Sequence, residues 1–163
     1  TVSLSYMTPY GPVEGPTEKI PANSRRTYSV GDVVPGEWEV STLVSADVPV
    51  VAERAMYGNN RGWGHDSVGV ASPASVWYLA EGCTNTGFET WVLIQNPNPT
   101  QANVSLTYMT PRGPVDGPYD TLPAYSRKTY NVGDVVPGEW EVSTMVESSL
   151  PIVAERSMYG DSN

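Results

Sequence analysis

The chain has 163 residues, with 18 acidic and 9 basic side chains and a formal net charge of −9. Phosphate binding needs clustered Lys and Arg, and an anionic membrane surface attracts the same side chains. The acidic balance therefore argues against nucleic acid and membrane partners, and no apolar run is long enough to span a bilayer. The single cysteine, Cys83, forms no internal disulfide. We interpret it as a small buried residue, with a free thiol or an intermolecular link as alternatives.

The chain contains nearly the same sequence twice. Residues 2–58 recur as residues 104–160 at a constant offset of 102, and 40 of the 57 aligned positions are identical. A fixed period is typical of tandem repeats, and about 100 residues is the size of one β-sandwich domain. We therefore predict an array of all-β domains.

Alternating apolar and polar residues in the first copy predict strands. Val2, Leu4 and Tyr6 share one face, and a second stripe runs from Trp38 to Val44. This stripe predicts that Trp38, and Trp140 in the second copy, lie in the core.

The second copy predicts seven short strands bounded by Gly and Pro turns. Their approximate bounds are 76–81, 90–96, 102–110, 119–123, 126–133, 140–147 and 151–159. Seven short antiparallel strands in this length predict a two-sheet, immunoglobulin-like β-sandwich.

These elements divide the chain into three parts. Residues 1–58 form an incomplete repeat that lacks its first two strands, 59–75 form a Gly- and Ser-rich linker, and 76–163 form a complete repeat. An incomplete sandwich leaves an open sheet edge, which another chain could fill by strand addition.

Three features of the sequence predict contacts between domains. Trp91 begins a strand that is apolar on both faces, so a neighbouring domain or a thicker core covers its second face. Trp63 and His65 lie in the linker, where an aromatic residue usually packs on a flanking domain.

Each copy also carries a charged pair inside an apolar strand. Glu53 with Arg54, and Glu155 with Arg156, are adjacent and therefore point to opposite sheet faces. Each side chain is expected to find a cross-strand or cross-domain partner, which favours a place at the joint between repeats.

The run from Val76 to Gly82 (VWYLAEG), the run from Gly87 to Asn98 (GFETWVLIQNPN) and the run from Ile152 to Tyr159 (IVAERSMY) resemble a tandem repeat family of large secreted or cell-surface bacterial proteins. The Gly64-His65 linker element fits the same pattern. The family is described mainly as a domain of unknown function. The resemblance implies an extracellular β-rich repeat without known catalytic residues, and Cys83 departs from its pattern.

Signals for catalysis, cofactors or metals are weak. A Cys83–His65 pair lacks an orienting group, and lone His65 does not make a zinc site. Glu139 and Glu141, like Glu37 and Glu39 in the first copy, would share a strand face and could bind Ca²⁺ or act as an acid–base pair. A solvated face is the simpler interpretation, so we expect no enzyme, no cofactor and no metal.

The sequence thus predicts a non-catalytic structural repeat of a secreted or cell-surface protein. It would form a stalk, adhesin shaft or filament, with neighbouring repeats or identical subunits as partners. The alternative is a carbohydrate-binding accessory module, for which Trp63 is the candidate stacking residue among 5 Trp and 10 Tyr.

Overall fold

The computed structural model describes residues 1–160, apart from the side chain of Asn59, so the last three residues of the predicted second repeat lie outside the described part. The described residues form antiparallel β-sheets with short 3-10 turns and no α-helix. No helix there is long and apolar enough to cross a membrane. The strands are β1 (Val2–Thr8), β2 (Gly11–Glu18), β3 (Ser41–Ala46), β4 (Glu53–Gly58), β5 (Trp63–Val68), β6 (Ala74–Leu79), β7 (Phe88–Asn96), β8 (Ala102–Thr110), β9 (Gly113–Leu122), β10 (Ser126–Asn131) and β11 (Ser143–Gly160).

The second repeat consists of two sheets that share one long strand, β11. Its first part, Ser143 to Ser148, lies between β6 and β8, and β9 completes that sheet. Its last part, Val153 to Gly160, pairs with β7, which pairs with β10 on its other side. We predicted two strands here, 140–147 and 151–159. The structure has one, because Pro151 is tolerated where β11 changes partners.

One apolar core lies between these two sheets. Val92 and Ile94 from β7 are fully buried with Leu106 and Tyr108 from β8 and Val146 from β11. Burying one aliphatic side chain contributes about 1.5–3 kcal/mol. Two sheets packed on a common core are consistent with a β-sandwich, which agrees with the predicted all-β class.

The first repeat reproduces one sheet of the second in the same register. Leu4 lies opposite Val44 in β1 and β3, as Leu106 lies opposite Val146 in β8 and β11. The register shift in the β1–β2 ladder also recurs at the equivalent place between β8 and β9. The first core is thinner, with only three buried apolar residues, which are Val2, Leu4 and Tyr6.

The predicted linker is not a plain tether. Residues 63–68 form β5, which pairs with β4 as a hairpin. Its register copies that of β7 on β11: Trp63 lies opposite Gly58, and Phe88 lies opposite Gly160. The chain therefore fills part of the missing strand's place itself, which removes the need for another chain to donate a strand beside β4.

The predicted core positions of Trp38 and Trp140 are wrong. Their side chains are 93% and 60% exposed, because the residues before Ser41 and Ser143 are loops that follow a tight turn and not strands. The apolar alternation begins two residues later, at buried Val142.

Candidate functional site at the joint between the repeats

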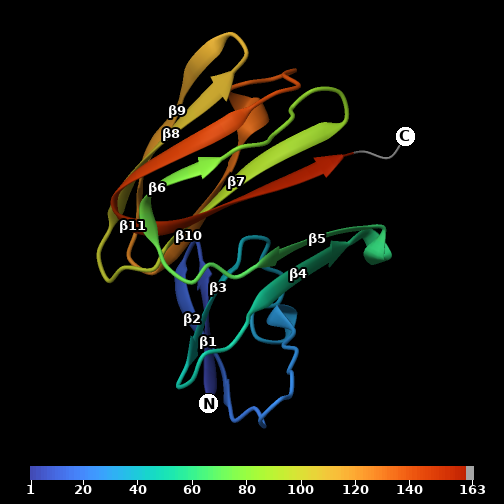
Figure 1. The fold of residues 1–163 in the computed structure, drawn as a ribbon, viewed down its shortest axis with the longest axis vertical. Helices are drawn as coiled ribbons and strands as arrows, with labels where there is room; N and C mark the ends of the chain where they lie inside the picture. The colour runs from blue at the N-terminus through green and yellow to red at the C-terminus, as the bar shows by residue number, and fades with distance from the viewer. Residues whose placement is uncertain (161–163) are drawn as a thin grey trace.

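The outer face of the β10–β7–β11 sheet forms one side of the joint. Arg127, Gln95 and Val153 are register partners across its three strands, so their side chains share that face. The first repeat lies on the opposite side, with β1 and β2 beneath β10 (Figure 1). The central strand is thus covered on both faces, by its own core and by the other repeat.

Arg127 is the most deeply buried charge of the joint. Its side chain is 1% exposed, and Nη1 donates a hydrogen bond to Oε2 of Glu39 at 2.7 Å. Burial lowers the pKa of the Arg127 guanidinium, and the negative charge of Glu39 opposes that shift. Glu39 comes from the loop before β3, so this ion pair links the two repeats.

A second contact joins the end of β1 to β7. Gln95 Nε2 lies 3.0 Å from Sδ of Met7, and both side chains are buried. Thioether sulfur is a weak acceptor, so the contact contributes mainly through packing.

The β4–β5 hairpin supplies the third contact. Arg54 Nη2 donates to Oε1 of Glu155 and lies 3.0 Å from Nδ1 of His65. Burial, and then the positive charge of Arg54, lowers the pKa of His65. The neutral ring accepts the Arg54 hydrogen bond at Nδ1, so His65 orients the side chain that reaches Glu155.

An aromatic pair extends this contact. The Trp63 and Tyr159 rings meet edge to face, with centroids 5.5 Å apart and planes at 72°. Aromatic pairs of this geometry contribute about 0.5–1.5 kcal/mol beyond their buried area. Trp63 also covers Gly58, where an added Cβ would come within 1.8 Å of the indole.

The remaining predicted joint residues lie outside these contacts. Glu53 is exposed in β4, and Arg156 pairs at 3.3 Å with Glu81 of its own repeat. Trp91 is half-buried, and its indole N–H donates to Glu89 at 3.1 Å. The joint therefore unites Trp63, His65, Arg54 and Glu155, and leaves the other three at its edge or beyond it.

Four joint residues were not predicted from the sequence: Met7, Glu39, Gln95 and Arg127. Three of them have an identical residue in the other repeat. Comparing the sequences of the two repeats therefore cannot show that one residue of each identical pair is buried at the joint.

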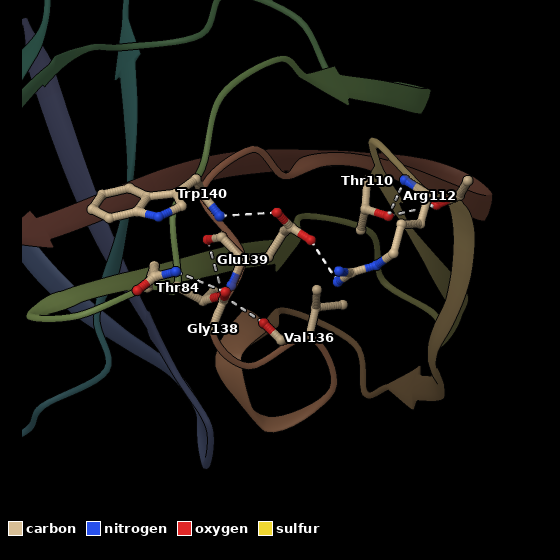
Figure 2. Close-up of polar contacts among 9 residues, drawn as sticks. Thr84, Thr110, Arg112, Val136, Gly138, Glu139 and Trp140 are labelled. Carbon is tan, nitrogen blue, oxygen red and sulfur yellow. Dashed lines mark hydrogen bonds and ion pairs between the residues drawn. The ribbon is translucent and has the colours of Figure 1, made fainter.

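The carboxylates at 139 and 141 do not form the predicted pair on a strand face. Figure 2 shows Glu139 holding the loop before β11. Its side chain accepts from Arg112 Nη2 at 2.6 Å and from the Trp140 backbone N–H at 3.0 Å. Glu141 is exposed and takes no part in this network.

Thr84 fastens the same loop from the other side. It accepts from the Glu139 backbone N–H at 3.0 Å, and its own backbone N–H donates to the Glu139 carbonyl at 2.8 Å (Figure 2). Glu139 is thus a structural carboxylate that fixes where Trp140 lies.

Metal-ligating residues do not gather in the described part of the chain, where no group of three His, Cys, Asp or Glu side chains could hold an ion. Cys83 is buried and its backbone N–H donates to Thr90, whereas the polar neighbours of His65 are Arg54 and Glu155. The structure therefore does not bring Cys83 and His65 together as a pair.

No known family and no curated protein matches the chain. Among solved structures it is similar to the Anabaena sensory rhodopsin transducer, at 24% sequence identity and a TM-score of 0.48. That similarity covers 55% of this chain and 100% of the other. A similarity at this level carries no argument about function, and membership of the bacterial repeat family stays a prediction.

Proposed function

We propose that this chain is a non-catalytic structural segment of a secreted or cell-surface bacterial protein. Its repeats would build a stalk, an adhesin shaft or a filament. The observation that supports this role is the buried Arg127, which is neutralised by Glu39 of the other repeat. An orientation that kept Arg127 covered but moved Glu39 away would leave a desolvated charge without its partner, so the joint favours one orientation. A shaft needs such fixed joints in order to project.

We infer further that each complete repeat is a variant of the immunoglobulin-like sandwich. In that fold the second strand pairs with the fifth, and the third with the sixth. The pairs β7–β10 and β8–β11 support this order. The variation lies at the edges, because β6 joins the β8 sheet and the end of β11 joins the β7 sheet. The fourth strand, β9, also pairs with β8 and not with the fifth strand, β10.

Strand donation by another chain would now apply to the open sheet edges of the first repeat, at β5, which pairs with β4 alone, and at β3. β3 pairs with β1, whereas its counterpart in β11 also pairs with β6. A β6-like strand from a neighbour would fit beside β3. Light scattering coupled to size exclusion tests this version, and a clean monomer at high concentration would remove it.

The fixed joint is tested by ¹⁵N relaxation of the intact chain. If the joint holds one orientation, amides of both repeats report the same rotational correlation time. Glu39→Arg should separate the two values, because it places like charges together at Arg127, while Glu141→Arg should not. Independent tumbling of the repeats in the unaltered chain would contradict the proposal.

A carbohydrate-binding module is the second candidate. Trp63 packs on Tyr159 and Trp140 packs on Phe88, so Trp38, at 93% exposed, is best placed to stack on sugars, followed by Trp140 at 60%. A glycan array with Trp38→Ala and Trp140→Ala variants tests this candidate. Binding that is lost in these variants would favour it, and the absence of any binding would remove it.

A further inference from the structure

The free end of the second repeat carries the same residues as the end of the first repeat that is buried in the joint. Met7, Thr8 and Glu39 correspond at the 102-residue offset to Met109, Thr110 and Glu141. Residue types are identical at all three places. The surface that docks in the first repeat is therefore present a second time.

Burial separates the two ends. Met7 and Thr8 are 1% and 4% exposed beside the second repeat. Met109 and Thr110 are partly exposed, and Glu141 is exposed whereas Glu39 is partly buried. The second repeat has the larger core, so a thinner core cannot explain why the first repeat buries its end residues more deeply. The cover supplied by the neighbouring repeat explains this deeper burial.

This free end is also hollowed. A shallow depression of about 460 Å³ is lined by Met109, Thr110, Trp140 and Glu141 among others. Glu141 belongs to its lining, and Glu139 is already bound to Arg112. The exposed carboxylate of Glu141 is therefore available to an incoming cation.

We propose that Met109, Thr110 and Glu141 form a docking surface for the outer sheet face of a further repeat of the same kind. The partner would carry an arginine at the place of Arg127 and a glutamine at the place of Gln95, because these side chains meet Glu39 and Met7 in the existing joint. This inference rests on the proposed structural role. Two differences lie nearby. Tyr10 against Arg112 is outside the contact, since both residues are highly exposed. Ala80, Glu81 and Gly82, which also line the depression, have no counterpart in the first repeat.

The proposed contact is heterologous, with a loop end on one repeat and a sheet face on the next. Such a contact repeats in one direction without closing on itself unless its rotation forms a ring. The same two surfaces can therefore extend an array indefinitely. Trp38 remains 93% exposed in the docked first repeat, whereas Trp140 lines the depression and packs on Phe88, with ring centroids 6.3 Å apart.

Methionine oxidation in a longer chain tests the docking surface. A further copy of residues 62–163, placed after Asn163, continues the 102-residue period and adds one more sheet face. Peroxide oxidation followed by mass spectrometry then compares Met7 with the original Met109. In the present chain Met109 should react faster than Met7. In the extended chain its rate should fall to that of Met7, with the partly exposed Met145 as the reference for the dose of oxidant.

Matched charge reversals distinguish the two joints in the extended chain. Glu141→Arg should restore the fast oxidation of Met109 alone, and Glu39→Arg should expose Met7 alone. If Met109 reacts equally fast in the present and extended chains while Met7 stays protected, the docking surface is wrong and the existing joint stands. If Met7 reacts as fast as Met109 in the present chain, the joint itself is absent and the proposed function falls with it.

Discussion

Arg127 donates to Glu39 across the joint at 2.7 Å with a side chain that is only 1% exposed. Arg25 is the same residue at the same place in the first repeat, and it is exposed. Arg127 lies in β10, which pairs with β7, whereas residues 24–29 of the first repeat form no strand. The two identical residues therefore differ in burial because strand pairing and the neighbouring repeat differ, and not because the local sequence does. The joint is thus one of the features that make two similar repeats physically unequal.

Removing the Glu39 carboxylate should destabilise the chain. Glu39→Ala leaves Arg127 desolvated without a counter-charge, and losing one partner of a buried pair costs about 3–5 kcal/mol. Glu39 is 36% exposed, so we expect about 3 kcal/mol, the lower end of that range. Glu141→Ala is the matched control and should change stability by less than about 0.5 kcal/mol. Urea denaturation measures both, and equal losses would contradict the assignment.

Gly58 should not tolerate a side chain. A Cβ there would lie 1.8 Å from the Trp63 indole, which must then move away from Tyr159. Gly58→Ala is expected to cost about 1–3 kcal/mol, as overpacking does elsewhere. Gly31→Ala is the control, because a Cβ at Gly31 meets nothing within 4 Å. Thermal unfolding with Trp fluorescence should separate the two, and an unchanged Gly58→Ala variant would show that Trp63 does not pack there.

The joint should weaken as the pH falls. Burial and Arg54 hold the pKa of His65 below its ordinary 6.5, so the unfolded chain binds this proton more readily than the folded one. The stabilisation is fully present above pH 6.5 and is lost as the pH falls through the lower folded pKa. Besides Arg54, the charged groups around the ring are Glu155, Asp66 and Arg156.

A His65→Gln variant isolates this proton. Between about pH 7.5 and pH 5.5 the urea midpoint of the unaltered chain should fall further than that of His65→Gln, because other groups titrate in both. An identical fall in the two proteins would show that His65 does not couple to folding.

Two core tyrosines should respond oppositely to loss of the hydroxyl. The Tyr108 hydroxyl is buried without a hydrogen-bond partner among the described residues, and burial raises its pKa to about 12. Tyr108→Phe should therefore be neutral or stabilising. Tyr130 donates to Asp120 at 3.2 Å, so Tyr130→Phe should cost about 1 kcal/mol. Calorimetry measures the order, and a larger loss at Tyr108 would contradict it.

Much of the fold could be predicted from the sequence because it depends on local alternation. Val104, Leu106 and Tyr108 recur at period two and are buried as predicted. The constant 102-residue offset predicted repeated all-β domains, and the ladders of the two repeats use one strand register. The strand β5 had a signal that was missed: Gly62-Trp63 corresponds to Gly87-Phe88 at the start of β7.

Sequence by itself determined the all-β class, the period and the residues that alternate into each core, since these follow from the geometry of a single strand. Only the tertiary structure decided which of two identical residues is buried, as for Arg127 against Arg25 and Met7 against Met109. It also placed Trp38 and Trp140 in solvent and brought Arg54 to Glu155. The physical reason is that burial at a joint depends on what packs from outside the repeat, and a repeated sequence is the same whether or not a neighbour covers it.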